Sequence, residues 1–301
     1  MTKLKTILVA SDLSVNADSA IRRAALLAKQ SGAKLELLHV LEDWPWEAPD
    51  SLQLPPEPLL RLLTDEAREM LQEQADRTAG DGLRLDLRVE AGRGFVGIIR
   101  RARKIGADLI VVGAHGRRSM RDLFLGTTAE KVARKGDRPV LVVKTPAETP
   151  YRRVLAPTDF SEASRRAFFT ALDLAPDASF DLLHVYRLWG AGRLSLATIG
   201  DEGLQRYHRQ LLEKAETQMK EYLHDVNLGT RRLKRHLRQG HPPSLIPAQA
   251  AELGVDLVAV GTEGLSGLPY LLLGSVAEHV MRHAECDVLA VKPSNFRFQL
   301  P

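Results

Sequence analysis

The chain has 301 residues, of which 44% are hydrophobic and 27% are charged, and its formal net charge is +4. This composition is typical of a soluble globular protein, and so small a net charge does not indicate a nucleic acid or an anionic membrane as a partner. The densest basic run, Arg231–Arg238, is interpreted as a charged edge strand. The single cysteine, Cys286, excludes an intrachain disulfide, and no apolar stretch approaches the length of a membrane span. We therefore expect a cytoplasmic protein that does not insert into a membrane.

Short β-branched runs alternate with amphipathic helical patterns along the chain. In the first half, strands are expected near residues 5–10, 34–40, 83–90, 108–112 and 139–144, and helices near 15–30, 57–79, 95–105 and 127–135. In the second half, strands are expected near 152–157, 180–186, 231–238, 256–260 and 287–292, and helices near 162–174, 200–225, 243–253 and 275–284. This alternation predicts two tandem, doubly wound α/β domains, each with a parallel sheet covered by helices on both faces.

The two halves repeat one glycine motif. Gly113-Ala-His-Gly116 is followed by Gly126-Thr-Thr, and Gly261-Thr-Glu-Gly264 is followed by Gly274-Ser-Val. In each copy the motif begins where an apolar strand ends and stops where a helical pattern begins. Glycines there let a ligand approach the backbone closely, and N–H groups at the helix start can receive an anion. We therefore expect these loops to bind a phosphate-bearing ligand.

The first strand of each half leads into a second candidate feature. Asp12 is followed by Leu-Ser14, and Asp159 is followed by Phe-Ser161. Each carboxylate either accepts a hydrogen bond from a ribose hydroxyl or caps the next helix beside the serine. Because ligands of doubly wound sheets bind beyond the carboxyl ends of the strands, each aspartate is placed to face the same pocket as the glycine motif.

Several patterns also have a purely structural interpretation. The segments Thr127–Glu130 and Ser275–Glu278 fit a capping box, so each hydroxyl serves either a helix cap or a phosphate. His39 and His184 lie within apolar runs and are interpreted as buried histidines with satisfied hydrogen bonds. The segment Gly92–Gly97 reads as a dinucleotide fingerprint, but the acidic residue expected at the end of the next strand is absent. It is interpreted as a tight strand-to-helix turn.

Taken together, these motifs resemble the universal stress protein family over nearly the whole chain, as two fused copies. The shared features are the aspartate after the first strand, the Leu-His-Val strand at Leu37–Val40 and Leu182–Val185, the Gly-x2-Gly-x9-Gly motif followed by Thr or Ser, and the last strand of each half. The resemblance implies an adenine nucleotide alpha hydrolase-like fold with strand order 3-2-1-4-5. It also implies domains at residues 1–146 and 151–294 that pair through their last strands.

The ATP-binding branch of this family implies which positions would hold an adenine nucleotide. Asp12 and Val40 would contact the adenosine end. The phosphates would be cradled by the glycine motif and the hydroxyl residues after it, namely Gly113, Gly116, Gly126, Thr127 and Thr128. The matching set in the second half is Asp159, Val185, Gly261, Gly264, Gly274, Ser275 and Val276.

The two copies of the motif differ in charge. The first is accompanied by His115 and Arg117, with two further arginines nearby, which suits a polyphosphate. The second has Glu263 in place of the histidine, and the loop that follows offers no cation. Because an unpaired carboxylate repels a triphosphate, we expect the first half to bind ATP better. The second half is expected to bind weakly, to bind something less charged, or to be structural.

These features predict a stress-response regulator in which ATP or a related adenine nucleotide, with or without Mg²⁺, biases the binding of an unidentified partner protein. No catalytic base, phosphate-activating lysine or metal site can be named from the sequence, so we expect at most slow hydrolysis of ATP. The alternative is a ligand-independent interaction module in which the glycine loops are vestigial. The sequence leaves open whether whole chains form homodimers.

Overall fold

The computed structural model describes residues 4–42, 57–80, 82–116, 125–187, 196–263 and 273–300. Two of the predicted site residues, Arg117 and Gly264, lie outside these ranges. The first half contains β1 (Thr6–Ser11), a 3-10 turn (Val15–Ala17), α1 (Asp18–Ser31), β2 (Lys34–Leu41), α2 (Glu57–Thr78), β3 (Leu85–Ala91), α3 (Gly94–Lys104), β4 (Leu109–Gly113), α4 (Thr127–Lys135) and β5 (Val140–Val143). The second half contains β6 (Arg153–Pro157), α5 (Glu162–Leu174), β7 (Ser179–Tyr186), α6 (Leu196–Leu223), β8 (Leu233–Gln239), α7 (Pro242–Leu253), β9 (Leu257–Gly261), α8 (Ser275–His283) and β10 (Asp287–Val291).

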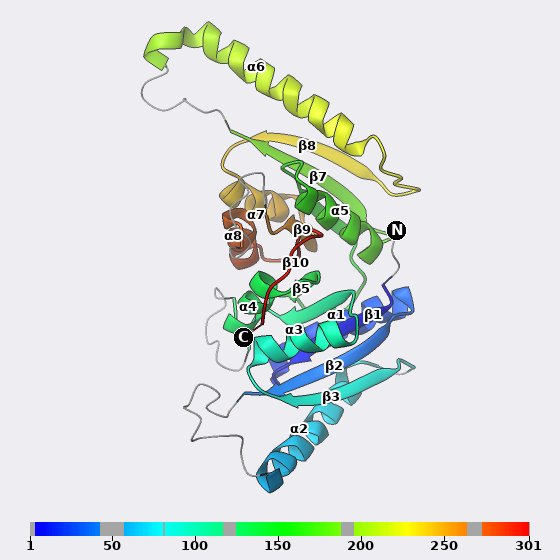
Figure 1. The fold of residues 1–301 in the computed structure, drawn as a ribbon. Helices are drawn as coiled ribbons and strands as arrows, with labels where there is room; N and C mark the ends of the chain where they lie inside the picture. The colour runs from blue at the N-terminus through cyan, green and yellow to red at the C-terminus, as the bar shows by residue number, and fades with distance from the viewer. Residues whose placement is uncertain are drawn as a thin grey trace.

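The strands of both halves form one continuous sheet in the order β3-β2-β1-β4-β5-β10-β9-β6-β7-β8 (Figure 1). Each half is parallel and has the expected order 3-2-1-4-5. The halves join where β5 and β10 pair antiparallel, with Leu141 opposite Leu289. This is the pairing through last strands that the family resemblance implies. The basic strand β8 lies at an outer edge of the sheet, as its sequence predicts.

Apolar side chains cover both faces of the sheet, as expected for parallel strands between two helical layers. In β4, Leu109 and Val111 contribute to one apolar layer, whereas Ile110 and Val112 contribute to the other. The first layer takes in residues of α1, α2, α5 and α6, and the second takes in residues of α3, α4, α7 and α8. Each layer continues from one half into the other, so the halves share their core.

The longest helices lie near the ends of the sheet. Figure 1 shows α2 beside β3 and α6 beside β8, so each long helix covers an outer strand. Within the part of the chain that the structure describes, no helix is both long enough and apolar enough to cross a bilayer.

Candidate functional site

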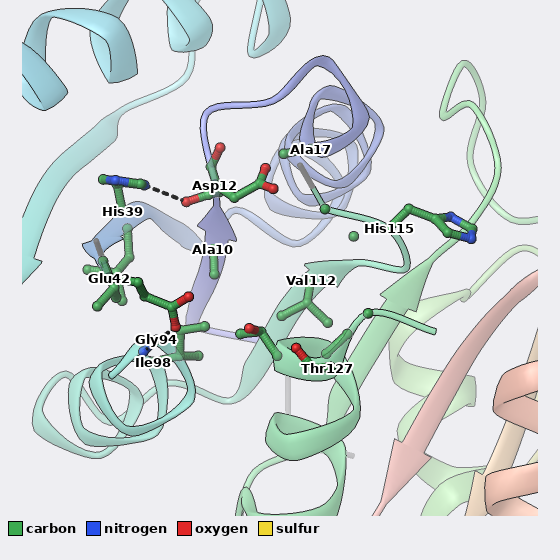
Figure 2. A pocket seen from close by; sticks show the side chains of 18 of the residues that line it. Ala10, Asp12, Ala17, His39, Glu42, Gly94, Ile98, Val112, His115 and Thr127 are labelled. Atoms are coloured by element: carbon green, nitrogen blue, oxygen red, sulfur yellow. Dashed lines mark hydrogen bonds between the residues drawn. The ribbon is translucent and has the colours of Figure 1, made fainter. Parts of the chain in front are cut away.

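A cavity of about 380 Å³ lies at the carboxyl edge of the first half, and we call it the first-half cavity. Figure 2 shows Ala10 of β1 and Val112 of β4 between the Asp12 loop on one side and the start of α4 on the other. β1 and β4 are neighbours, with Ala10 opposite Val112, so the loops that follow these strands meet. A volume of this size is within the range of small-molecule sites.

The first-half cavity gathers the predicted residues of that half. Those that the structure describes all line it: Asp12, Val40, Gly113, His115, Gly116, Gly126, Thr127 and Thr128. They come from the ends of three strands and the start of one helix. In Figure 2 the His115 ring extends away from Asp12, so this side chain lies at the rim.

The glycines of the motif permit close contacts between loops. The Gly126 N–H donates to the Ala114 carbonyl at 2.7 Å, and a Cβ added at Gly126 would lie 3.3 Å from that oxygen. A Cβ added at Gly116 would lie 2.8 Å from Asp12 Oδ2. A side chain at Gly116 would therefore require the Asp12 carboxylate to shift.

Of the two alternatives for Thr127 and Ser275, a helix cap or a phosphate contact, the capping box does not form. Gly126 and Gly274 are the N-cap residues, neither helix has a side-chain cap bond, and Thr127 and Ser275 are already helical. Glu130 instead forms an ion pair with Arg134, with 2.9 Å between Glu130 Oε1 and Arg134 Nη2. The first N–H groups of α4 have no partner within the helix, and they border the cavity. This arrangement favours an anion at the start of α4.

Asp12 closes the turn between β1 and the 3-10 segment. Its Oδ1 accepts from Ser14 N at 3.1 Å and from Ser14 Oγ at 2.6 Å, while α1 begins only at Asp18. In the second half, Asp159 Oδ1 accepts from Ser161 N at 3.0 Å, and Ser161 itself caps α5. Neither aspartate is therefore the N-cap of its helix.

Both strand histidines have hydrogen-bond partners, as predicted, but only His39 is buried, whereas His184 is half-buried. His39 Nδ1 lies 2.9 Å from the Ser11 carbonyl, and His184 Nδ1 lies 2.8 Å from the Thr158 carbonyl. The dashed line at His39 in Figure 2 marks the first of these hydrogen bonds. Burial lowers the pKa of His184. His39 also lines the first-half cavity, which its apolar sequence context did not indicate.

Sequence reasoning also missed Glu42 as a cavity residue. Its Oε1 accepts from the Gly94 N–H at the start of α3, and both residues line the first-half cavity. A carboxylate therefore takes the place that a pyrophosphate occupies in the dinucleotide fingerprint, which supports the interpretation of this glycine-rich segment as a turn. The only sequence signal for Glu42 is its position immediately after β2.

A second-half cavity of about 180 Å³ occupies the equivalent edge. The predicted residues that the structure describes line it: Asp159, Val185, Gly261, Gly274, Ser275 and Val276. A Cβ added at Gly261 would lie 2.6 Å from Ala163 C and Ser164 N, whereas the nearest atom to one added at Gly113 is 3.5 Å away. The start of α5 thus lies closer to the end of β9 than the Asn16–Ala17 backbone lies to the end of β4.

The charge of the second-half cavity also differs. Glu263 lines it, and the nearby Lys292 follows β10. Burial lowers the pKa of Lys292 to about 8, and the Glu263 carboxylate acts in the opposite direction. This cation is distant from the glycine loop in sequence, so the loop pattern did not reveal it.

A doubly wound sheet with an aspartate loop and a glycine loop at its carboxyl edge, present twice in one chain, defines a tandem α/β protein with a candidate site in each half. The model of the universal stress protein family matches residues 3–144 and 150–292. The chain therefore belongs to the universal stress protein family, whose members are stress-response proteins, as two tandem copies.

Known proteins resemble the chain over its whole length and over its halves. Universal stress protein E of Escherichia coli K12 is 23% identical, with 99% of this chain and 96% of that protein covered. A putative universal stress protein of Staphylococcus haemolyticus is 31% identical over 47% of this chain and 85% of its own length. The solved structure of a universal stress protein from Archaeoglobus fulgidus has a TM-score of 0.68 at 20% identity, covering 97% of this chain and 100% of that one. This last similarity concerns the fold alone.

Proposed function

We propose that the protein binds ATP or a related adenine nucleotide in the first-half cavity, and that the bound nucleotide biases its association with a partner protein in the cytoplasm. The observation that carries this proposal is the convergence of Asp12, Val40 and the glycine motif around one cavity of about 380 Å³. These residues are far apart in the sequence, and each suits a different part of a nucleotide.

The chemistry of the lining fits the three parts of such a ligand. N–H groups at the start of α4, together with the Thr127 and Thr128 hydroxyls, suit phosphate oxygens. Asp12 is an acceptor suited to ribose hydroxyls. Apolar side chains such as Val40 and Ile98 offer a surface for the base. Among the described residues, no group of three or more His, Cys, Asp or Glu side chains could hold a metal, so Mg²⁺ is expected to enter with the phosphates.

The unequal cavities support the unequal roles proposed for the halves. The second-half cavity has about 180 Å³, which is below the usual range for ligand sites, and Glu263 lies in its wall. A triphosphate beside that carboxylate would be repelled. We propose that ATP binds in the first half and that the second half does not take it at comparable affinity.

Calorimetric titration of the nucleotide-stripped protein with Mg-ATP tests the proposal. We expect one site per chain, loss of binding in Gly126→Val, and retained binding in the matched variant Gly274→Val. Circular dichroism and the urea midpoint of each variant show whether it is folded. Two sites of equal affinity would contradict the inequality of the halves. An absence of heat at any ATP concentration, in folded protein, would favour the ligand-independent interaction module.

A further inference from the structure

Gln74 is a buried amide of α2 that reaches the turn carrying Asp12. Its side chain is 1% exposed. Gln74 Oε1 accepts from Ser11 Oγ at 2.5 Å, and Nε2 donates to the Ser14 carbonyl at 2.9 Å and to Asp18 Oδ1 at 2.7 Å. One side chain therefore holds residues on both sides of Asp12.

The turn that Gln74 holds is conformationally unusual. Leu13 has a φ of 65°, in the left-handed region that non-glycine residues rarely adopt. Such a conformation costs on the order of 1–3 kcal/mol and persists where surrounding contacts enforce it. Ser11 Oγ accepts from Leu13 N at 2.9 Å while it donates to Gln74. The amide thus fixes the hydroxyl that stabilises the strained residue.

The same contacts fix the direction of the Asp12 carboxylate. Ser14, whose carbonyl is held by Gln74, donates its N–H and its hydroxyl to Asp12 Oδ1. Oδ2 lies toward Gly116, across the mouth of the glycine motif. Gln74 is therefore connected to the cavity residue Asp12 by hydrogen bonds on both sides of Ser14, one to its carbonyl and others from its N–H and hydroxyl.

The second half lacks this amide. Tyr222 of α6 occupies the position of Gln74, at the same offset that separates Gly113 from Gly261. Its ring packs edge-on against Phe160, which has a φ of 66° and is the counterpart of Leu13. Thr158 Oγ1 accepts from Phe160 N at 2.9 Å and lies 3.0 Å from Ser164 Oγ. The second-half turn is thus held by ring packing and hydroxyls, without a buried amide from the long helix.

We propose that Gln74 is a positioning residue of the first-half cavity, which holds the Asp12 carboxylate where it selects ligands that carry ribose hydroxyls. This inference rests on the proposed binding of an adenine nucleotide in that cavity. It predicts that Gln74 affects the recognition of the sugar and leaves the recognition of phosphates and base in place. A residue that only supported the fold would weaken the binding of all nucleotides alike.

The test compares ATP with 2′,3′-dideoxy-ATP, by calorimetry, on four proteins: wild type, Gln74→Met, Gln74→Tyr and Gln72→Met. Gln72 lies on the same helix with an exposed side chain and serves as the matched control. We expect the wild type and Gln72→Met to prefer ATP by about tenfold, the value of one hydrogen bond to a charged group. In Gln74→Met, the ATP affinity should fall to that for dideoxy-ATP, which should itself be unchanged. Gln74→Tyr places the second-half residue in the first half and should lose the preference in the same way.

The outcomes separate this inference from the proposed function. An equal loss of affinity for ATP and for dideoxy-ATP in folded Gln74 variants would overturn the positioning role, and so would an unchanged preference for ATP. A wild type that binds both ligands equally would overturn the role of Asp12 in sugar recognition and this inference with it, while nucleotide binding would stand. A wild type that binds neither ligand would overturn the proposed function itself, and the inference with it. Urea midpoints measured in parallel identify a variant that is unfolded, and the other Gln74 variant then decides.

Discussion

A lysine follows the last strand of each half, half-buried at Lys144 and buried at Lys292. Lys144 Nζ donates to the Ala284 carbonyl across the junction, and Lys292 is 3% exposed. Burial lowers the pKa of each lysine to about 8. The unfolded chain, with lysine pKa values near 10.4, then holds more protons than the folded chain above pH 8, so each lysine makes stability rise between about pH 8 and 10.5. Below that window each lysine is charged in the folded chain, and this lowers the free energy of unfolding by its full amount, about 3 kcal/mol for each lysine.

Replacement of Lys144 by methionine isolates this effect. We expect Lys144→Met to be more stable than wild type at pH 7.5 and to approach it at pH 10, as measured by urea unfolding at both pH values. The difference between the two proteins removes the contributions of other titrating groups. Lys214→Met, at an exposed position of α6, should follow the wild type at both pH values. A constant difference between Lys144→Met and wild type across this range would show that Lys144 does not titrate there.

Single residues of the site could be predicted only where a repeated pattern marks them. The glycine motif occurs twice at a fixed spacing, which singled out Gly113 and Gly126. Glu42 and Gln74 carry no such mark, because each reaches its place through the packing of another element. Lys292 has a counterpart in Lys144, but nothing in that repeat indicates its proximity to Glu263. Their roles depend on tertiary geometry, which a linear pattern does not contain.

At the scale of elements, the approach of α5 to β9 distinguishes the halves. A Cβ on Gly261 would meet the α5 backbone at 2.6 Å, and backbone atoms cannot move aside as a flexible side chain can. We expect Gly261→Ala to lower the free energy of unfolding by about 1–3 kcal/mol, the usual cost of overpacking. Gly113→Ala, whose Cβ has 3.5 Å of space, is the matched variant and should cost less. Urea unfolding of both variants checks this, and equal losses would refute the tighter approach in the second half.

The elements themselves could be predicted closely because their periodicity is strong. The helix expected at 127–135 has those bounds in α4, and the strands lie within about two residues of their expected ranges. The helix ends were less predictable. The helix expected from residue 15 begins at Asp18 after a 3-10 turn, and the capping boxes do not form because glycines already serve as N-caps. Competing local geometries of this kind differ little in energy, so propensity alone does not decide between them.

At the scale of the whole molecule, the order of strands followed from the family resemblance, whereas the contacts that lock the halves together did not. The charged side chains of α4 and α8 form one such contact, in which Arg282 donates to Glu130 at 3.3 Å and Arg134 lies 3.9 Å from Glu278. The two cross-pairs are counterparts in the repeat. They are partly exposed, so each is worth at most about 1 kcal/mol.

The buried carboxylate of Asp287 is the stronger link between the halves. It begins β10, is 0% exposed, and accepts from Arg23 Nε at 3.2 Å and from Tyr151 Oη at 2.6 Å. It also accepts from the N–H groups of Lys144 and Thr145 at the end of β5. Arg23, Lys144 and Thr145 belong to the first half, whereas Tyr151 stands at the start of the second. In the first half, the position equivalent to Asp287 is occupied by Pro139, which has no carboxylate. Only the second half therefore contributes such a link.

Asp287→Asn should therefore destabilise the whole chain. The substitution keeps the shape of the side chain but removes the negative charge that faces the Arg23 guanidinium. Arg23 is only 4% exposed, so its charge would then be buried without a counter-charge. Breaking a buried pair in this way costs about 3–5 kcal/mol, and the double variant Asp287→Asn/Arg23→Met should recover part of the loss. Asp177→Asn, at an exposed position of the second half, is the control.

Because both apolar layers cross the β5–β10 junction, urea should still unfold the single variant Asp287→Asn in one transition at a lower midpoint. An unchanged midpoint would show that the charge of Asp287 is dispensable, and two separate transitions would show that the shared core does not make the halves unfold together.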